Sequence, residues 1–509
     1  MDKHRTKILI IGIDGATWDI INPLIEEGKA PNFKKLKNKG AWARIESIDP
    51  PLTPIVWTSI ASGKMKEKHG ILDFFGTSCN VRVKRIWDIL EKHGYSIGLH
   101  EYPVTWPPRE CNGFIIPDFF ARDASTFPQE LSFIKELAIG KKNERSFGMR
   151  KYLLFLYKTY RYGLQLGTLW KVLKYFIRRR MSTFSPRDDF HKSRMLKLYL
   201  YSDIFINLYR RYQPDFAVTY FNQPDALGHR FWKYMDPEGF ANIPPKEIKK
   251  YGKVIKEAYM AIDKEIGRLL QYTSRHTLIA VVSDHGFRKT TTNPYGKSLR
   301  IRLEALMEAL NFPGDVVGVN VHISSYFRSQ KHKTAERATS KEELIEKLKG
   351  VQFTKDGQKI YEIVSRGEWI IVDTISTVDI PPQTPLRGTC YRYGDFIEDR
   401  LGDISGDHDK FGIFLISGEK IRKNFEIQNA SVLDVTPTIL AAIELPVAED
   451  MDGRILLDIF EPDWLKRKKP QFIETYEERG QIQLHARKEE SAEEGLEDLK
   501  DELRALGYL

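Results

Sequence analysis

Three apolar runs of the sequence end in the same way, and this shared ending limits the folds that are open to the chain. The runs are KILIIGIDG (7–15), FAVTYFNQPD (216–225) and TLIAVVSDHG (277–286). Each is rich in β-branched or aromatic residues and ends in an acidic residue near glycine or proline. Strands need nearly continuous apolar runs when helices cover both faces of their sheet. We therefore expect three strands in the interior of a sheet.

Helical patterns lie between these runs. Apolar residues recur at three- and four-residue spacing in the segments 86–94 and 255–272. Alternation of strands and helices predicts an α/β protein with a doubly wound, mostly parallel sheet flanked by helices. Ligands of such sheets bind beyond the carboxyl ends of the strands, which is where the acidic residues fall. The sequence therefore predicts a functional site at that edge of the sheet.

The composition is that of a soluble globular protein. The chain has 509 residues, of which 41% are hydrophobic and 29% are charged, and these values argue against general disorder and against a polytopic membrane protein. Three cysteines, at 79, 111 and 390, are too few and too scattered for a disulfide framework or a thiolate zinc site. The first residues lead into a predicted strand without a signal-peptide pattern. We expect a cytoplasmic protein, with membrane association left open.

The positive charge belongs to one segment. The chain has a net charge of +10, but residues 141–212 contain 18 Lys and Arg against 4 Asp and Glu, so the remainder sums to −4. This segment is also aromatic and lies between two predicted strands. We interpret it as a helical insertion or cap (141–212) between an N-terminal part of the core (1–140) and the remainder of that core (213–462), followed by a charged helical tail (463–509).

The insertion admits more than one role. Lys158, Arg161, Lys171 and Lys174 interrupt its apolar stretches, so no window approaches the roughly 20 apolar residues of a transmembrane helix. One interpretation is a cap packed on the core with solvated charges. A second is peripheral contact with an anionic membrane, or with a lipid-linked substrate. Nucleic acid is not an expected partner, because the segment contains no recognition module.

Aspartates and histidines stand at sharp breaks of the predicted elements. Asp14 follows the first strand, Asp225 and His229 are four residues apart, Asp284 adjoins His285, and His408 lies in SGDHDKFG. Carboxylates and neutral imidazoles are ligands for Zn²⁺, Mn²⁺ and related ions. A lone Asp after a strand is more often a cap or turn residue. The joint pattern is more specific, and it suffices for two metal ions with about three protein ligands each.

A hydroxyl in the segment 50–64 (PPLTPIVWTSIASGK) could serve such a metal pair as nucleophile. Thr53 stands where a helix N-cap would, Pro54 suits the first helical position, and Gly63 could end the helix. A helix N-terminus favours phosphate, and metal coordination lowers the cost of an alkoxide. The alternative is that Thr53 is only a cap. Thr58 is the rival hydroxyl, although it would lie more than one turn inside the helix.

The motifs together resemble a known family. In order, they are GIDG, LTPIVWTSIASG, QPDALGH, SDHG and GDH, and the segment 432–454 is similar to the C-terminal end of the family's core. They resemble the type I phosphodiesterase and nucleotide pyrophosphatase branch of the alkaline phosphatase superfamily. The resemblance implies an alkaline phosphatase-like fold and a phosphothreonine intermediate formed on Thr53. It also implies one metal ion held by Asp14, Thr53, Asp284 and His285, and another held by Asp225, His229 and His408.

Two positions depart from the family pattern. Nucleotide pyrophosphatases typically carry Asn three residues after the threonine, where this chain has Val56, and Gly after the last histidine, where it has Asp409. Both departures put a nucleotide substrate in doubt, and the closer match is to prokaryotic members of unassigned substrate. Sulfatase activity is not expected, because Cys79 lacks the Pro and Arg that a sulfatase carries two and four residues on.

We therefore expect a metal-dependent phosphoric ester hydrolase that uses two divalent ions, either Zn²⁺ or Mn²⁺, with zinc preferred. The expected activity is that of a phosphodiesterase or pyrophosphatase, and the substrate is a small or lipid-linked phosphate ester. Two alternatives stay open: a phosphomutase or phosphomonoesterase of the same superfamily, and a non-catalytic protein that binds membrane surfaces. The sequence does not predict the oligomeric state.

Overall fold

The computed structural model divides the chain into two compact units. It describes residues 5–135, 157, 160, 163–181, 184–240, 243–290, 299–312, 316–321, 324–329, 339–366, 369–375, 380–399 and 404–478. Of the described residues, those within 1–227, 256–287 and 408–501 form the first unit, and those within 228–255 and 288–407 form the second. From the sequence, 213–462 is interpreted as the remainder of the core. The structure assigns much of that range to the second unit, which has a hydrophobic core of its own.

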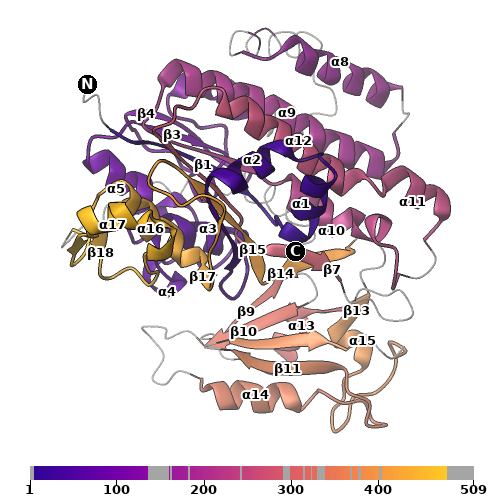
Figure 1. Cartoon of the computed structure of the whole chain (residues 1–509). Helices are drawn as coiled ribbons and strands as arrows, with labels where there is room; N and C mark the ends of the chain where they lie inside the picture. The colour runs from indigo at the N-terminus through magenta and orange to yellow at the C-terminus, as the bar shows by residue number, and fades with distance from the viewer. Residues whose placement is uncertain are drawn as a thin grey trace. The chain divides into compact units, whose positions relative to one another are not determined.

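A nine-stranded sheet lies at the centre of the first unit (Figure 1). Its order is β16-β2-β15-β6-β1-β5-β3-β4, with β17 also paired to β2. The three strands expected from the sequence are β1 (Lys7–Ile13), β5 (Phe216–Phe221) and β6 (Thr277–Val282). β1 pairs in parallel with both β5 and β6, and nearly every residue of the three is buried. The predicted interior strands are thus neighbours, and their carboxyl ends share one edge.

The other strands extend this centre on both sides. β3 (Ile97–His100) and β4 (Gly113–Ile116) continue the parallel part beyond β5. β15 (Phe411–Ser417) is antiparallel to both β6 and β2 (Ala41–Glu46), and the short strands β16 (Phe425–Glu426) and β17 (Ala430–Ser431) pair in parallel with β2. The sheet is therefore mostly parallel, and the predicted α/β fold class is confirmed.

Helices cover both faces of this sheet (Figure 1). On one face lie α9 (Pro186–Tyr212) and α12 (Val254–Leu270), and on the other lie α3 (Thr53–Ser62), α5 (Ile86–Lys92) and α16 (Val435–Ala442). The apolar spacing in 86–94 and 255–272 correctly predicted α5 and α12. Two further helices, α1 (Trp18–Glu26) and α2 (Pro31–Lys39), follow β1 in the chain. The coverage explains why the central strands carry almost no exposed positions.

The described part of the basic insertion is helical, as predicted. It consists of α8 (Leu166–Arg180) and α9, which pack against each other. α9 begins with a capping box, in which Ser185 accepts a hydrogen bond from the backbone N–H of Asp188. Among the residues that the structure describes, no helix is long and apolar enough to cross a membrane.

In its described part, 463–478, the charged tail differs from the predicted helix. A helix was expected over 463–509, but the described part contains only the short α17 (Pro462–Arg467), followed by the extended β19 (Phe472–Ile473) paired with β18 (Val447–Ala448). The hydroxyl of Thr475 donates to Asp450, and that of Tyr476 donates to the Pro446 carbonyl. These bonds hold the segment extended along the core. Residues 479–509 lie outside the described residues.

The second unit contains a four-stranded antiparallel sheet. Its order is β11 (Tyr361–Arg366), β12 (Trp369–Thr374), β10 (Ser324–Ser329) and β9 (Val316–Val321). A strand pair, β8 (Leu299–Ile301) with β13 (Ile397–Asp399), accompanies it, as do α11 (Pro245–Tyr251), α13 (Leu303–Ala309), α14 (Lys341–Lys349) and α15 (Tyr393–Phe396). Leu306, Phe327, Leu344 and Ile370 belong to its buried core.

A buried ion-pair cluster joins α9 to the end of β3. Glu101 directly follows β3 in the left-handed conformation, with φ 58°. Its carboxylate lies 3.1 Å from the Lys135 ammonium and 3.1 Å from the Lys197 ammonium of α9. Burial by itself would raise the pKa of Glu101, but the two lysines hold it below its ordinary value. The carboxylate is therefore kept ionised by partners that come from distant parts of the chain.

Because Lys135 belongs to this buried cluster, we expect Lys135→Met to lower the stability of the protein strongly. The side chains of Lys135 and Glu101 are each 2% exposed, and breaking a buried pair by removing one partner costs about 3 kcal/mol or more. We expect that loss in the free energy of unfolding, measured by urea denaturation. The control is Lys466→Met, which removes an exposed pair with Asp463 and should cost less than about 1 kcal/mol. Equal losses in the two variants would contradict the assignment.

Candidate active site

The turns that follow β1 and β6 lie together because these strands are parallel neighbours. Asp14 follows β1, and its backbone N–H donates to the Phe221 carbonyl at the end of β5, over 2.9 Å. Asp284 lies two residues beyond β6, and its carboxylate accepts from the Gly15 N–H over 3.3 Å. Gly15 has φ +64°, and a Cβ there would lie 3.2 Å from Asp225. Glycine thus permits the close approach of two turns and a helix at this edge.

The first group of site residues consists of Asp14, Asp284 and His285, all buried. His285 Nε2 lies 3.4 Å from Asp14 Oδ1 and 3.3 Å from Asp284 Oδ2. None of these three atoms has a hydrogen-bond partner among the described residues. His285 Nδ1 lies 2.9 Å from the Gly286 carbonyl, so it is the nitrogen that carries a proton and donates it there. Nε2 then directs a lone pair at two carboxylate oxygens, an arrangement that a cation would stabilise.

The second group adds Asp225 and His408. Asp225 lies in the first turn of α10 (Gln223–Met235), and His408 lies in β14 (Gly406–Asp409). His408 Nε2 is 3.2 Å from Asp225 Oδ1, and its Nδ1 is 2.9 Å from the Pro51 carbonyl. The His408 and His285 rings stack with centroids 3.6 Å apart. Ligand atoms of Asp225, His285 and His408 all lie within 4.8 Å of one another, so the two groups adjoin at His285.

The remaining predicted ligand is His229. It lies on α10 four residues after Asp225, as predicted, but it belongs to the second unit. Its Nδ1 is 2.9 Å from the Gly406 carbonyl, the same type of contact that His285 and His408 make. Such a contact fixes the tautomer and leaves Nε2 as the ligand atom. Its role as a metal ligand stays a prediction.

Thr53 is the first residue of α3. The predicted N-cap is one residue off, because the Leu52 carbonyl accepts the Val56 N–H over 2.9 Å and Leu52 is therefore the cap. The helix ends at Gly63, as predicted. The Thr53 hydroxyl lies 3.5 Å from Asp14 Oδ2 and is not used for capping. The rival hydroxyl of Thr58 instead donates to the Pro54 carbonyl over 2.7 Å, within the helix.

Burial and repulsion between like charges raise the pKa of two carboxylates in the site. Burial, followed by the charges of Asp284 and Asp225, raises the pKa of Asp14 well above its ordinary range. Burial is also the main cause that raises the pKa of Asp284 to about 7. Three buried carboxylates repel one another when they are ionised, and positive charge close to them offsets this repulsion.

The sequence missed Tyr220, which contacts the site from within β5. Its hydroxyl donates to Asp14 Oδ2. Its ring packs edge-on against Trp57 of α3, with centroids 5.2 Å apart. Tyr220 therefore orients a carboxylate and supports the helix that carries Thr53. No sequence signal distinguishes it, because an aromatic residue in an apolar run is typical of any buried strand.

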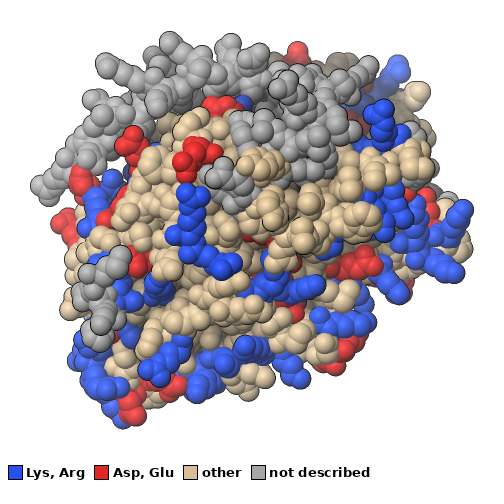
Figure 2. Space-filling view, turned by 90° about the horizontal axis from the view of Figure 1, so that it is seen from above, with Lys and Arg blue, Asp and Glu red and all other residues tan. Residues whose placement is uncertain are grey.

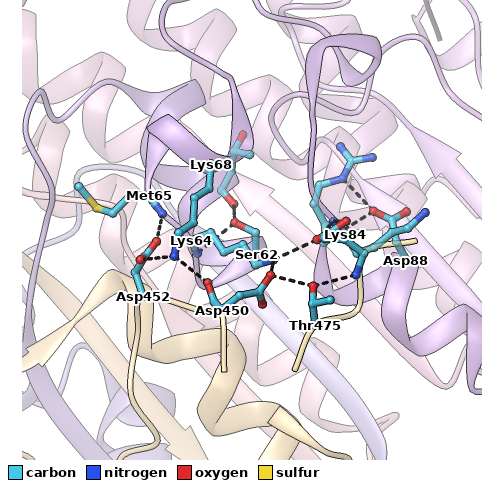
Figure 3. A network of polar contacts seen from close by, with 12 residues as sticks. Ser62, Lys64, Met65, Lys68, Lys84, Asp88, Asp450, Asp452 and Thr475 are labelled. Atoms are coloured by element: carbon cyan, nitrogen blue, oxygen red, sulfur yellow. Dashed lines mark hydrogen bonds and ion pairs between the residues drawn. The ribbon is translucent and has the colours of Figure 1, made fainter. Parts of the chain in front are cut away.

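A polar network fixes the other end of α3 (Figure 3). The Gly63 carbonyl accepts from the N–H groups of Asp452 and Gly453, over 2.8 and 3.1 Å. The Lys64 ammonium, whose side chain is 3% exposed, lies 2.7 Å from Asp450 and 3.0 Å from Glu477 of the C-terminal segment. Both ends of the helix are thus held, which limits the positions open to Thr53.

A large cavity opens elsewhere in the first unit. Its volume is about 1370 Å³, and its lining comes mainly from residues between Gly70 and Ile115, together with Glu477 and Glu478. None of the seven predicted site residues lines it. The clustered carboxylates and imidazoles therefore lie outside this large cavity.

The donor set fits a divalent metal ion. Buried carboxylate oxygens and an imidazole nitrogen without hydrogen-bond partners converge, and Asp and His are ligands that Zn²⁺ accepts. The histidine Nδ1 contacts with backbone carbonyls are the outer contacts that orient metal-bound imidazoles. Of the seven predicted site residues, the first unit brings together six: Asp14, Thr53, Asp225, Asp284, His285 and His408.

The sheet and the edge at which these residues meet define a class, the α/β proteins with an alkaline phosphatase-like fold. The family model of type I phosphodiesterase / nucleotide pyrophosphatase matches residues 8–375. The chain belongs to this family and is therefore a phosphoesterase of the phosphodiesterase and pyrophosphatase class. Because this family consists of metallo-phosphoesterases, membership also implies divalent metal ions.

Solved structures were compared as well. Human and murine ectonucleotide pyrophosphatase / phosphodiesterase 5 each show 14% sequence identity and a TM-score of 0.45, over 89% of this chain and 100% of theirs. No curated protein matches the chain.

The carboxylates predict how stability depends on pH once divalent metal has been removed. The ordinary pKa of Asp284 is 3.8 and its folded value is about 7, so between these values the folded chain binds more protons than the unfolded chain. Stability should therefore fall as pH rises from about 4 to about 7. We expect the thermal midpoint of chelator-treated protein to drop over this range, and added Zn²⁺ or Mn²⁺ to restore it at the upper end.

The control for this measurement is Asp284→Asn. The variant lacks one titrating group and one repulsive charge, so its midpoint should depend less steeply on pH. The same slope in both proteins would show that other groups cause the effect.

Proposed function

We propose that this chain hydrolyses phosphodiester or pyrophosphate bonds with the help of two divalent metal ions, and that Thr53 is its nucleophile. One observation carries the proposal. The Thr53 hydroxyl stands at the start of a buried helix, 3.5 Å from Asp14, where three carboxylates and two imidazoles converge. Hydroxyl, carboxylates and imidazoles are the groups that metal-assisted phosphoryl transfer requires.

The ligands divide into two sets in this proposal. Asp14, Asp284 and His285, together with Thr53, hold one ion, and Asp225, His229 and His408 hold the other. Bound divalent ions polarise phosphoryl oxygens and lower the pKa of a coordinated hydroxyl or water. Zn²⁺ is preferred because imidazole is prominent among the ligands, while Mn²⁺ suits the carboxylates.

The proposed reaction has two steps. The Thr53 oxygen attacks phosphorus, the bond to the leaving oxygen breaks, and the alcohol or phosphate departs on the opposite side. The N-terminal end of α3 receives the charge of the phosphoryl oxygens. The phosphorus bound to Thr53 still carries the second substituent of the substrate. Water then attacks this phosphorus and breaks its bond to the Thr53 oxygen, so that a phosphomonoester is released and the Thr53 hydroxyl returns. Tyr220 keeps Asp14 oriented through its hydrogen bond.

The proposal does not extend to nucleotides. Val56 occupies the position where nucleotide pyrophosphatases carry Asn, and it is fully buried in α3. Its side chain offers no hydrogen bond to a phosphate oxygen. A small or lipid-linked phosphate ester is the proposed substrate.

Thr53→Ala tests the nucleophile. With Zn²⁺ or Mn²⁺ present, we expect hydrolysis of bis(p-nitrophenyl) phosphate to fall on the order of a thousandfold or more, because the attacking oxygen is gone. Thr53→Ser should keep part of the activity. Mass spectrometry of wild type that is acid-quenched during turnover of this diester should find a p-nitrophenyl phosphoryl group on Thr53.

The matched control is Thr58→Val on the same helix. It removes a buried hydroxyl that bonds only within α3, so the activity should change little. If Thr53→Ala hydrolyses the diester as fast as wild type, Thr53 is not the nucleophile. A parallel assay with p-nitrophenyl phosphate separates diesterase from monoesterase activity.

A further inference from the structure

One helix of the basic insertion has a continuous apolar stripe on its outward face. The stripe consists of Leu166, Trp170, Leu173, Ile177 and Met181, on α8 and its C-terminal cap, and these side chains are between 39% and 73% exposed. Their spacing of four, three, four and four residues places them on one side of a helix. Five large apolar side chains in one line form a patch, whereas scattered exposed residues would need no explanation.

The opposite face of α8 already packs on the protein. Thr168, Val172 and Tyr175 are its buried residues, and at 100° per residue they lie about half a turn away from the stripe. Figure 1 shows α8 on the outer side of α9, which separates it from the sheet. Among the described residues of the first unit, the inner face of α8 is therefore the one that packs, and this packing does not explain the stripe.

Basic residues flank the stripe on both sides. Lys174 lies along one flank and Arg180 along the other, and both are exposed. Lys171 lies farther round the helix, with its ammonium 3.4 Å from the centroid of the Tyr199 ring of α9. From Arg145 to Arg187 the sequence contains eleven Lys and Arg and no Asp or Glu. The first acidic residues beyond are Asp188 and Asp189, and the Asp189 carboxylate accepts from the Tyr175 hydroxyl and lies 3.6 Å from Arg179. Figure 2 shows Lys and Arg beside uncharged surface on the face seen from above.

We propose that α8 lies on the surface of an anionic lipid bilayer, with its stripe among the acyl chains and its basic flanks at the headgroups. A helix with Trp, Leu and Ile on one face and Lys and Arg beside them is the pattern of an interfacial helix. Anionic lipids attract each basic residue near the surface. The long stems of Lys174 and Arg180 let their charged groups reach the headgroups while the stripe is inserted.

The basic residues beside the stripe favour a membrane over a second copy of the chain or a nucleic acid. If the stripes of two copies met face to face, their basic flanks would lie against each other, which costs free energy. A nucleic acid would place its phosphates against Trp170 and its apolar neighbours. An anionic bilayer offers acyl chains to the apolar stripe and negatively charged headgroups to the basic residues. The contact is peripheral and does not depend on the chemistry proposed for Thr53.

Vesicle sedimentation tests the proposal with the full-length chain. We expect wild type to sediment with phosphatidylcholine vesicles that contain about 30% phosphatidylserine at low salt, and to be released as salt rises. Trp170→Ser with Ile177→Ser should weaken this binding at least about tenfold, because apolar insertion is lost. Lys174→Gln with Arg180→Gln should weaken binding to the anionic vesicles only, and leave binding to pure phosphatidylcholine unchanged.

The matched control is Leu457→Ser, which removes an exposed apolar side chain elsewhere in the first unit and should bind like wild type. The charge variant changes only exposed positions, so it decides the matter even if the stripe variant misfolds. The proposal is overturned if wild type ignores anionic vesicles at low salt, or if both double variants bind as tightly as wild type. It is also overturned if wild type is a dimer that the stripe variant converts to monomer without any vesicle binding.

Discussion

Mutual repulsion among three buried carboxylates is the constraint on which the rest of the site depends. Asp14, Asp225 and Asp284 converge where water is excluded, and burial raises the pKa of Asp14 and Asp284. A fold keeps such groups together only if its backbone is rigid at that place and positive charge is supplied. The parallel pairing of β1 with β5 and β6 gives the rigidity. The donor set, with imidazole nitrogens aimed at carboxylate oxygens, is suited to take the charge from metal ions.

The nucleophile helix is positioned by the same edge of the sheet. Its first residue, Thr53, faces Asp14, Trp57 packs on Tyr220 of β5, and its far end is tied through Lys64 to the C-terminal segment. Contacts at both ends and along one side leave the helix little freedom. The chemistry proposed for Thr53 therefore rests on interactions between segments that are hundreds of residues apart in the chain.

The basic insertion adds a second, separate property. α9 belongs to the core, since it packs on the sheet and Lys197 joins the buried cluster at Glu101. α8 lies outside it and has apolar residues on two faces, only one of which the core uses. The sequence showed that this segment was basic and helical, and both packing on the core and contact with a membrane were consistent with that pattern. The direction of each face became known only from the packing of α8 on α9.

The central strands, the fold class and the residues that gather at the strand ends could be predicted from the sequence. Nearly continuous apolar runs and the acidic residue after each run are local signals, and parallel pairing brings such ends to one edge. Four features could be seen in the structure alone: Leu52 rather than Thr53 caps α3, Tyr220 contacts Asp14, 228–255 and 288–407 form a second unit, and the segment after α17 runs extended. Each of these depends on partners that are distant in the chain, and local residue preferences carry no information about distant partners.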